Sequence, residues 1–452
     1  MLKRKIYDEL VQWKEEERRV ALCLIGARQI GKTTIVKEFA KNYYEEVVEL
    51  NFLENPDAKK LFDGSLRAED ILFKLSTFTR QELIEGKTLI LLDEIQECPS
   101  ARTAIKFLVE DGRYDYIETG SMLGVKIKEI KSYPVGFERI VNMYPLDFEE
   151  FLWANGIGAK VIDYLKQCFE EKTAVSESIH DTLKDLFHRY LIVGGMPEAV
   201  NTYLKTKNMQ QVIKVQEELI DLYSNDIRKY AEESQRHAIL EIFKAIPSQL
   251  DNQNRRFKLS QVMPKEKISR HENDFLWLTL AGIALPSYAL QEPQYPFQLN
   301  EKRNLFRLFL FDTGLLCAMS LDDIQFMILN GDLSINEGSI LENYFATQLT
   351  ANGFPLYYYN SKKFGELDFL IQNGRAPTII EVKSGKEYRK HAAMNRVLTV
   401  ENWKFQDKIV FCEGNVERDG DILYLPWYMA IFILPHKTEY IFPELNLDFN
   451  LE

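Results

Sequence analysis

One short segment constrains the fold more than any other part of the chain. It reads GARQIGKTT, residues 26–34, and it joins a run typical of a buried strand, residues 18–25, to a run typical of a helix, residues 35–43. A short apolar run rich in branched residues predicts a strand buried on both faces of a parallel sheet. The glycines allow the backbone to curl until several N–H groups point inward, at the N-terminus of the following helix. We therefore expect a strand, a loop and a helix that together bind phosphate.

The spacing within this segment gives its side chains separate roles. Gly26, Gly31, Lys32 and Thr33 satisfy the pattern G-x-x-x-x-G-K-S/T. Lys32 would bring positive charge to the β- and γ-phosphates of a nucleotide, and the hydroxyl of Thr33 would ligate Mg²⁺. The alternative, an ordinary glycine turn, is disfavoured because the match stands between a strand and a helix. We expect the whole segment to contact the nucleotide: Gly26, Ala27, Arg28, Gln29, Ile30, Gly31, Lys32, Thr33 and Thr34.

Two more apolar strands follow, at residues 46–52 and 88–94, and the second ends in Asp93 and Glu94. An aspartate at the tip of such a strand holds Mg²⁺ in phosphate-loop enzymes, and a glutamate after it can polarise the attacking water as a general base. A strand ending in two acidic residues is common by itself, so this interpretation depends on the phosphate loop. The extra strand and the paired acids resemble the ATPase branch that includes AAA proteins. We expect Mg²⁺-dependent binding and hydrolysis of ATP.

Further segments extend the pattern along the chain. They read LLDEIQ, TGS, YPLDFEEFL, HRYLIVGGMPEAV, LFRLFLFDTGLL, and ELDFLI followed by IIEVKSG. Together with the phosphate loop, these segments and their order resemble a large bacterial and archaeal family of AAA-type ATPases with a C-terminal domain of unknown function. The resemblance spans nearly the whole chain and implies an α/β ATPase domain with a helical lid. One departure is GFERI before the YPL segment, where relatives tend to have a Gly-Arg pair.

The resemblance also suggests roles for two later strands. A fourth strand, residues 114–121, ends where AAA proteins keep a γ-phosphate sensor, and Thr119 and Ser121 are the candidates, with ordinary turn formation as the alternative. A fifth strand, residues 139–146, begins with Arg139, either an arginine finger or a salt-bridged surface group. We favour the surface group. The GGMPEAV stretch, which no Lys-Thr pair follows, is expected to form a tight turn between lid helices.

Length and charge limit the remaining classes. At 452 residues the chain exceeds what one core serves, since cores stop growing near about 250 to 300 residues, so we expect two or three domains. The net charge of −12 opposes indiscriminate adhesion to nucleic acid or anionic membranes. No apolar run approaches the roughly 20 residues of a membrane span, and we expect a cytoplasmic protein. Five separated cysteines indicate reduced, mostly buried thiols rather than a disulfide framework or a zinc site.

The middle of the chain, residues 237–319, shows short helical periods and two hairpin-like apolar runs. The resemblance implies a winged-helix module here, which would bind nucleic acid or serve as a spacer or protein contact. A basic run from Arg255 to Arg270 offers a local site for DNA. A solvated charged face is the interpretation that we favour for it.

From residue 335 the pattern becomes helix, strand, strand, turn, strand, helix and strand. That order predicts a small α/β domain and is the element order of the restriction-endonuclease-like fold. The site of that fold is an aspartate followed by Glu-x-Lys on the next strand, here Asp368, Glu381 and Lys383. An even number of residues in the turn at 373–376 would put all three on one face of the sheet, whereas an odd number would separate Asp368 from the others.

The chemistry of a nuclease requires that convergence. Two carboxylates, Asp368 and Glu381, would hold Mg²⁺, which activates water and stabilises phosphate charge, while Lys383 orients or deprotonates the nucleophile. Glu342, on the preceding helix, is a further candidate ligand. Folds of this kind are often kept as binding platforms after losing activity, so an inactive domain remains the alternative.

These interpretations give three expected domains: an AAA-type ATPase domain with a helical lid at residues 1–225, a winged-helix-like domain at 226–325, and a restriction-endonuclease-like domain at 326–452. The first hypothesis is an ATP-driven enzyme in which the ATPase controls access of the C-terminal site to DNA. The second is an ATP-dependent switch that binds a protein partner through an inactive nuclease-like domain. A chaperone-like machine is a third, and assembly with other copies of the chain is compatible with each.

Overall fold

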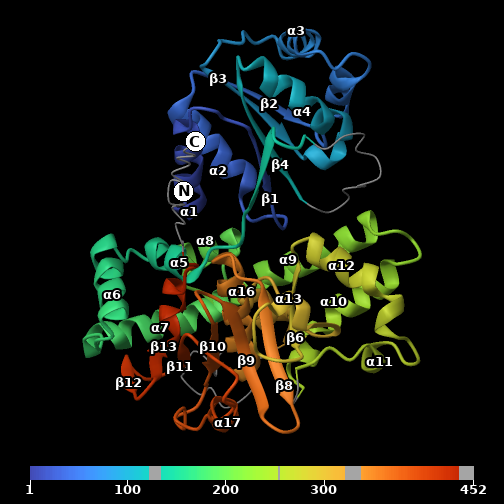
Figure 1. The fold of residues 1–452 in the computed structure, drawn as a ribbon. Coiled ribbons are helices and arrows are strands. Elements are labelled where there is room, and N and C mark those ends of the chain that lie inside the picture. The colour runs from blue at the N-terminus through green and yellow to red at the C-terminus, as the bar shows by residue number, and fades with distance from the viewer. Residues whose placement is uncertain (122–133, 253–254, 321–336, 437–452) are drawn as a thin grey trace, which may run out of the picture.

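The computed structural model describes residues 1–121, 134–252, 255–320 and 337–436, and they contain two sheets (Figure 1). The first sheet belongs to the N-terminal part, and all its strand pairs are parallel in the order β2-β3-β4-β1-β5. The strands are β1 (Ala21–Ile25), β2 (Glu46–Asn51), β3 (Thr88–Asp93), β4 (Asp115–Gly120) and β5 (Glu138–Asn142). The predicted α/β class and the strands expected from the sequence are therefore confirmed for this part of the chain.

Helices cover both faces of this sheet because its strands carry apolar side chains on both. Leu89 and Leu91 face one core with α1 (Lys5–Glu15) and α2 (Lys32–Tyr43), whereas Ile90 and Leu92 face another with α3 (Ala68–Thr79) and α4 (Pro99–Asp111). The strand order puts β4 between β1 and β3. Since parallel strands end at the same edge, the segments that follow β1, β3 and β4 lie together.

The chain leaves the first sheet through the YPLDFEEFL segment, which starts α5 (Phe148–Ala154). Asp147 and Glu150 form a capping box, in which each side chain accepts a hydrogen bond from the backbone N–H of the other. The Glu150 carboxylate also pairs with the buried Arg4 at 3.1 Å, and Arg4 donates to the Ile30 carbonyl at 3.0 Å. This motif thus ties the N-terminal segment, the phosphate loop and the first lid helix together.

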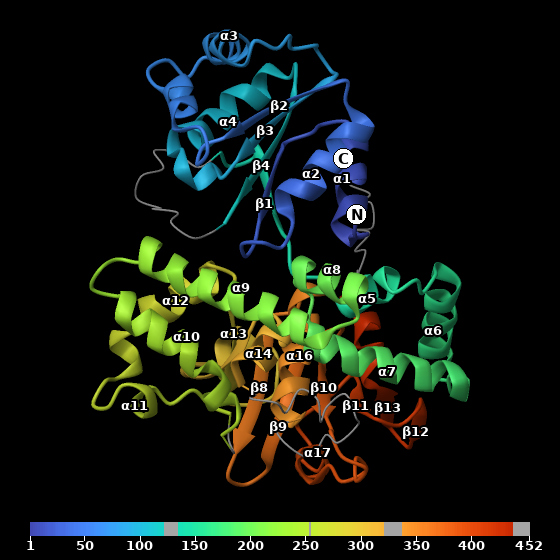
Figure 2. The same ribbon diagram turned by 180° about the vertical axis from the view of Figure 1, so that it is seen from behind.

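The lid helices lie between the two sheets, and Figure 2 shows α7, α8 and α9 crossing the molecule in front of the second sheet. They are α6 (Ala159–Glu171), α7 (Glu177–Val193), α8 (Pro197–Thr206) and α9 (Met209–Tyr230). The GGMPEAV stretch forms the expected turn between α7 and α8. A side chain on Gly195 would lie 2.0 Å from the Leu146 carbonyl oxygen, and the Gly195 N–H donates to Asp312 at 2.7 Å. The turn therefore needs glycine because three motif segments meet at it.

The middle region begins with helices, continues into a strand hairpin and ends with a further helix. Its elements are α10 (Arg236–Leu250), α11 (Leu259–Val262), α12 (Glu272–Leu280), β6 (Ala284–Leu290), α13 (Phe297–Asn300), β7 (Glu301–Leu310) and α14 (Thr313–Ser320). A winged helix remains a prediction for this region.

The second sheet is mixed, with the order β12-β13-β11-β10-β9-β8-β6-β7. Its C-terminal part contains α16 (Glu337–Ala351), β8 (Leu356–Ser361), β9 (Gly365–Gln372), β10 (Pro377–Val382), α17 (Ala392–Leu398), β11 (Lys408–Cys412), β12 (Glu417–Asp419) and β13 (Ile422–Pro426). The helix expected between the last two predicted strands is α17, and the beginning of the helix predicted from residue 335 lies outside the described residues. The sequence did not predict β12 and β13.

The middle region and the C-terminal region share this sheet, because β6 pairs in parallel with β8. The predicted domain boundary at residue 325 lies outside the described residues. One continuous core includes Leu24 of β1, Phe187 of α7, Phe309 of β7 and Phe411 of β11. The middle and C-terminal regions thus pack against the ATPase sheet through the lid helices. The division into three domains remains a prediction.

Candidate functional site

The phosphate loop follows β1, and its two motif glycines meet two different requirements. A side chain on Gly26 would lie 2.2 Å from the carbonyl oxygen of Met143, which follows β5. Gly31, just before α2, has a φ of +92°, in the left-handed region that favours glycine. The first glycine therefore permits close packing of two strand ends, and the second turns the chain into the helix whose N-terminus faces the loop.

Lys32 lies inside the loop rather than on its surface. Its ammonium donates to the carbonyl oxygens of Gly26 at 3.1 Å and Ala27 at 2.8 Å. Burial lowers the pKa of Lys32 to about 8, although the negative charges of Glu94 and Asp93 oppose the shift. The ammonium is thus held at the centre of the curl, within the electrostatic reach of both acidic residues that end the third strand.

Asp93 is the centre of a group of polar side chains at the edge of the sheet. Its carboxylate accepts hydrogen bonds from the Thr33 hydroxyl at 2.9 Å, from the Asn51 amide at 2.9 Å and from the Thr119 hydroxyl. The registers explain the convergence, since Asn51 lies opposite Asp93 and Asp93 lies opposite Thr119. Carboxylate, hydroxyl and amide oxygens are the hard ligands that Mg²⁺ prefers, so the residues present fit that ion.

Asn51 is a contact of Asp93 that the sequence interpretation missed. The available signal was its position at the end of an apolar strand, like that of Asp93 itself. Ser121, the other sensor candidate, is buried just beyond the end of β4. Arg139 pairs with Glu16 at 2.7 Å, and both are partly exposed, which agrees with the surface group that we favoured.

Glu94 follows Asp93 in a left-handed backbone conformation with a φ of +55°. Few residues other than glycine adopt this conformation, and such residues cluster at functional sites. Its carboxylate accepts a hydrogen bond from the Gln96 side-chain amide. The two adjacent carboxylates, Asp93 and Glu94, therefore have different hydrogen-bond partners.

The lid contacts the phosphate loop directly. The Arg28 guanidinium pairs with Asp226 of α9 at 2.6 Å, and the Tyr223 hydroxyl donates to the Arg28 carbonyl at 2.6 Å. On another side of the loop, Gly282 approaches so closely that an added Cβ would lie 3.2 Å from the Ala27 nitrogen. The loop is thus held between helix α9 and the turn that leads into β6.

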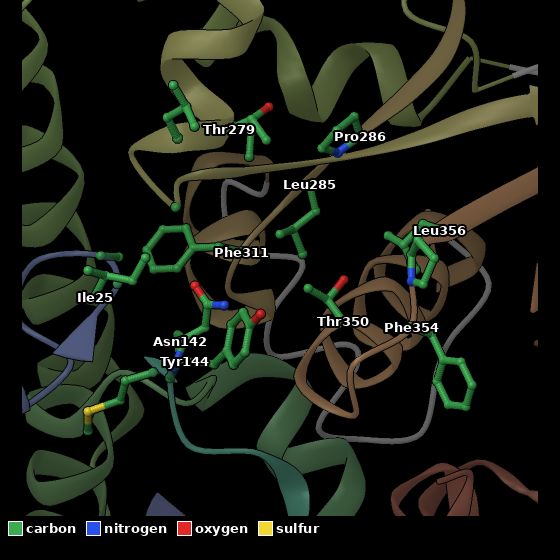
Figure 3. Close-up of a pocket in the computed structure, with 18 of the residues that line it drawn as sticks. Ile25, Asn142, Tyr144, Thr279, Leu285, Pro286, Phe311, Thr350, Phe354 and Leu356 are labelled. Carbon is green, nitrogen blue, oxygen red and sulfur yellow. The ribbon is translucent and has the colours of Figure 1, made fainter. Parts of the chain in front are cut away.

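A cavity of about 400 Å³ lies beside the start of the phosphate loop, between the ATPase sheet and the middle and C-terminal regions (Figure 3). Figure 3 shows Ile25, Asn142 and Tyr144 on one side and Leu285, Thr350 and Phe354 on the other. Of the predicted nucleotide-binding residues, only Gly26 and Ala27 line it. The cavity is therefore a feature of the junction and is separate from the polar group around Asp93.

A second polar group lies on the second sheet and contains the residues predicted for the C-terminal site. The turn between β9 and β10 comprises residues 373–376, an even number, and the antiparallel register continues toward Asp368 opposite Glu381. The Asp368 carboxylate accepts the Val382 N–H at 2.9 Å, and Lys383 pairs with Glu381 at 2.9 Å. The structure thus brings Asp368, Glu381 and Lys383 together on one face.

Glu342 of α16 joins this group, with two cationic partners that the sequence did not indicate. Arg255 pairs with its Oε1 atom, and Arg307 pairs with its Oε2 atom at 3.2 Å. Arg307 is fully buried, lies over the ring of Tyr358 and also pairs with Glu366. Arg307 lies within the LFRLFLFDTGLL segment, but no role was predicted for it, because its strand joins the C-terminal sheet only in three dimensions.

Burial changes the acidity of two carboxyl groups in this cluster. It raises the pKa of Glu381 to about 8, an effect that the charge of Asp368 increases and that of Lys383 opposes. It also raises the pKa of Glu342 to about 7, and the charge of Arg255 opposes that shift. Within the described part of the chain the Oε1 atom of Glu381 is buried without a hydrogen-bond partner. Hard oxygen donors and one unpaired carboxylate oxygen fit a divalent cation.

One further polar cluster lies inside the ATPase sheet. Ligand atoms of Cys23, Glu118 and Glu138 lie within 4.8 Å of one another. Arg102 of α4 donates to both carboxylate oxygens of Glu138, at 3.1 and 3.0 Å. Burial raises the pKa of Glu118 well above its usual range, which favours its protonated form beside Glu138. We interpret this cluster as a buried ion pair with a protonated neighbour that ties α4 to the sheet.

The parallel sheet, the glycine loop and the acidic strand end define a P-loop nucleotide-binding domain of the ATPase type. Comparison with protein families agrees, since residues 18–152 match an AAA domain. Residues 184–325 match a domain of unknown function (DUF8612), and residues 337–428 match another (DUF4143). The N-terminal part of the chain therefore has a P-loop ATPase fold and is similar to AAA domains.

Solved structures show weaker similarity over much of the chain. The Walker-type ATPase of Pyrococcus abyssi is 13% identical, with a TM-score of 0.43, over 71% of this chain and 96% of that one. The ORC2 protein of Aeropyrum pernix in its ADP form is 15% identical, with a TM-score of 0.29, over 74% and 95%. The ORC1 protein of Aeropyrum pernix in complex with DNA is 12% identical, with a TM-score of 0.29, over 70% and 90%.

No curated protein matches the chain. Among the described residues, no helix combines the length and the apolar character that crossing a membrane requires.

Proposed function

We propose that the chain is a Mg²⁺-dependent ATP hydrolase whose C-terminal carboxylate site acts on DNA. The observation that carries the first part is the convergence of Thr33, Asn51 and Thr119 on Asp93 at the same sheet edge as the buried Lys32. Backbone amides of residues 26–34 would hold the β-phosphate, as the helix N-terminus and loop favour negative charge. Thr33 and Asp93 would hold Mg²⁺, which neutralises charge on the phosphates when bound.

In this proposal Lys32 and Glu94 have separate tasks. The Lys32 ammonium moves from the loop carbonyls to the β and γ oxygens of ATP, where it stabilises the charge that develops on the transferred phosphoryl group. The Glu94 carboxylate accepts a proton from the water that attacks the γ-phosphorus. Thr119 would contact the γ-phosphate, and its hydrogen bond to Asp93, which also binds Thr33, supports this role.

The Lys32→Ala substitution tests this part. We expect ATP turnover to fall about 100-fold or more, since removal of one pre-organised charge donor has effects of that size. Lys37→Ala is the matched control, because Lys37 lies on the same helix, is half exposed and pairs with Glu49 at 2.8 Å. Equal turnover of Lys32→Ala and wild type, with the fold intact by circular dichroism, would reject the assignment.

For the C-terminal site we propose hydrolysis of a phosphodiester in DNA. Asp368, Glu381 and Glu342 would hold a divalent cation, which supplies Lewis acidity toward the phosphate, and Lys383 would orient the attacking water. The winged-helix-like region, residues 226–325, would bring DNA to the site. What supports the proposal is that Asp368 of β9, Glu381 of β10 and Lys383 just after β10 lie on one face of the sheet, where Glu342 of α16 joins them.

A second candidate is an ATP-dependent switch that binds a protein partner and has lost nuclease activity. The observation that favours it is the pairing of Glu342 with two arginines, because a carboxylate engaged in this way is a poor metal ligand. Nicking of supercoiled DNA by the full chain in Mn²⁺ distinguishes the two candidates. Nicking that is lost in Asp368→Asn but kept in Asp407→Asn, a change at an exposed position, would support the nuclease. Absence of nicking by the wild-type chain would support the switch.

A further inference from the structure

Glu342 is held by two arginines that differ sharply in their surroundings. Arg307 is fully buried and contacts Glu366, the Asp368 carbonyl and the Tyr358 ring as well as Glu342. The Arg255 side chain is 25% exposed. Among the described side chains, Arg255 forms its ion pair with Glu342. Arg307 is therefore part of the core, whereas Arg255 reaches in from the surface to a carboxylate that is almost fully buried.

The backbone around Arg255 is shaped for this contact. Arg255 has a φ of +45°, a left-handed conformation that is uncommon for residues with a side chain. At the first turn of α16, a Cβ on Gly338 would lie 2.7 Å from the Nη2 atom of Arg255. An unfavourable backbone conformation at one residue and a missing side chain at another thus both accommodate the guanidinium beside Glu342.

The charges of the cluster are nearly balanced with Arg255 in place. Glu342, Glu366, Asp368 and Glu381 are met by Arg255, Arg307 and Lys383. A divalent cation that approaches Asp368 and Glu381 would meet the positive charge of Arg255, which pairs with Glu342 of the same cluster. Coulomb repulsion between neighbouring like charges in a partly buried site changes an affinity by about an order of magnitude or more.

From these contacts we propose that Arg255 is an exchangeable internal counter-ion for Glu342. While its guanidinium is in place, Arg255 keeps the C-terminal carboxylate site from binding a divalent cation. The inference rests on the proposed metal site of Asp368, Glu381 and Glu342. The guanidinium and the metal compete for the same carboxylate oxygen, and only the more exposed of the two arginines can exchange. Displacement of Arg255 frees the Oε1 atom of Glu342 and removes one positive charge, and both changes favour the cation.

Titration calorimetry of the nucleotide-free full-length protein with Mn²⁺ tests the proposal. We expect Arg255→Gln to bind Mn²⁺ about tenfold more tightly than wild type, the size expected for removal of one nearby like charge. Arg270→Gln is the matched control, since the Arg270 side chain is 70% exposed and its ion pair joins it to Glu266 rather than to this cluster. We expect it to match wild type. Adding Asp368→Asn to Arg255→Gln should abolish the tight binding, which assigns that binding to this site.

Gly338→Ala provides an independent variant in which the charge is kept and the guanidinium is pushed aside. Tighter Mn²⁺ binding is again expected, so the test does not depend on correct folding of Arg255→Gln. Asp368-dependent binding that is equal or weaker in both variants would overturn the counter-ion role and leave the metal site standing. Absence of any Asp368-dependent binding in all variants would overturn the metal site together with the inference.

Discussion

The phosphate site and the C-terminal carboxylate cluster gather similar side chains but neutralise them differently. Around Asp93 the donors are neutral, namely two hydroxyls and an amide. Around Glu342 the donors are cations, Arg255 and Arg307. Neutral dipoles orient a carboxylate and leave its charge for an arriving cation. Ion pairs cancel that charge in advance, so a metal must displace a side chain first. The first site is arranged for binding and the second for exchange.

The largest effect that would sharpen this comparison is expected at Glu94. Glu94→Gln keeps the size of the side chain and removes the proton acceptor, so ATP should still bind while turnover falls at least about 100-fold. Single-turnover hydrolysis and a nucleotide-binding titration measure the two quantities separately. Glu97→Gln, which loses only a surface pair with Lys59, is expected to behave as wild type. Similar hydrolysis rates in both variants would exclude Glu94 as the base.

A smaller but still large effect is expected for stability at Arg307. Arg307→Met leaves Glu342 and Glu366 without a buried partner, and breaking a buried ion pair in this way costs about 3 to 5 kcal/mol. Urea unfolding measures the loss. Arg303→Met, on the same strand with an 89% exposed side chain, should cost little. Asp93→Asn should also cost less, because its partners are neutral; a greater loss there than at Arg307 would contradict the comparison.

The next effect is a pH dependence of ATP binding. Burial gives Lys32 a pKa of about 8 in the free protein, and bound phosphates would raise it. Above pH 8 the complex then holds a proton that the free protein has lost, so ATP affinity falls as pH rises, by at most about tenfold per unit. Calorimetry at pH 8.5 in two buffers with different ionisation enthalpies should show proton uptake. Lys32→Arg, which stays charged, should show none; equal uptake would reject the assignment to Lys32.

The smallest effect is expected at the contact between the phosphate loop and the turn before β6. Gly282 and Gly353 both have left-handed backbones, with φ values of +71° and +90°. Alanine at either position therefore carries a conformational cost of about 1 kcal/mol. Only at Gly282 does the new Cβ approach the phosphate loop, 3.2 Å from the Ala27 nitrogen. We expect Gly282→Ala to weaken ATP binding a few-fold in a titration and Gly353→Ala to leave it unchanged. Equal affinities would show that this contact does not influence the loop.

Much of the phosphate site could be predicted because one short segment contains most of its binding residues. Residues 26–34 supply loop, lysine and hydroxyl together, and Asp93 marks the end of an apolar strand. Asn51 and the lid contact between Arg28 and Asp226 were missed, since each depends on segments that the sequence does not show to be neighbours. For the C-terminal site, the period of the strands left two arrangements open, and only the even turn seen in the structure puts Asp368 and Glu381 on one face.

The features that the sequence determined by itself were local. They are the runs that form strands and helices, the positions that require glycine, and the charged residues that lie on each strand or at its end. Only the tertiary structure decided that β6 and β7 extend the C-terminal sheet and thereby bring Arg307 under Glu342. The physical reason is that hydrophobic periodicity reports which side of an element is buried, not against which partner. The charge balance of a buried site depends on that partner.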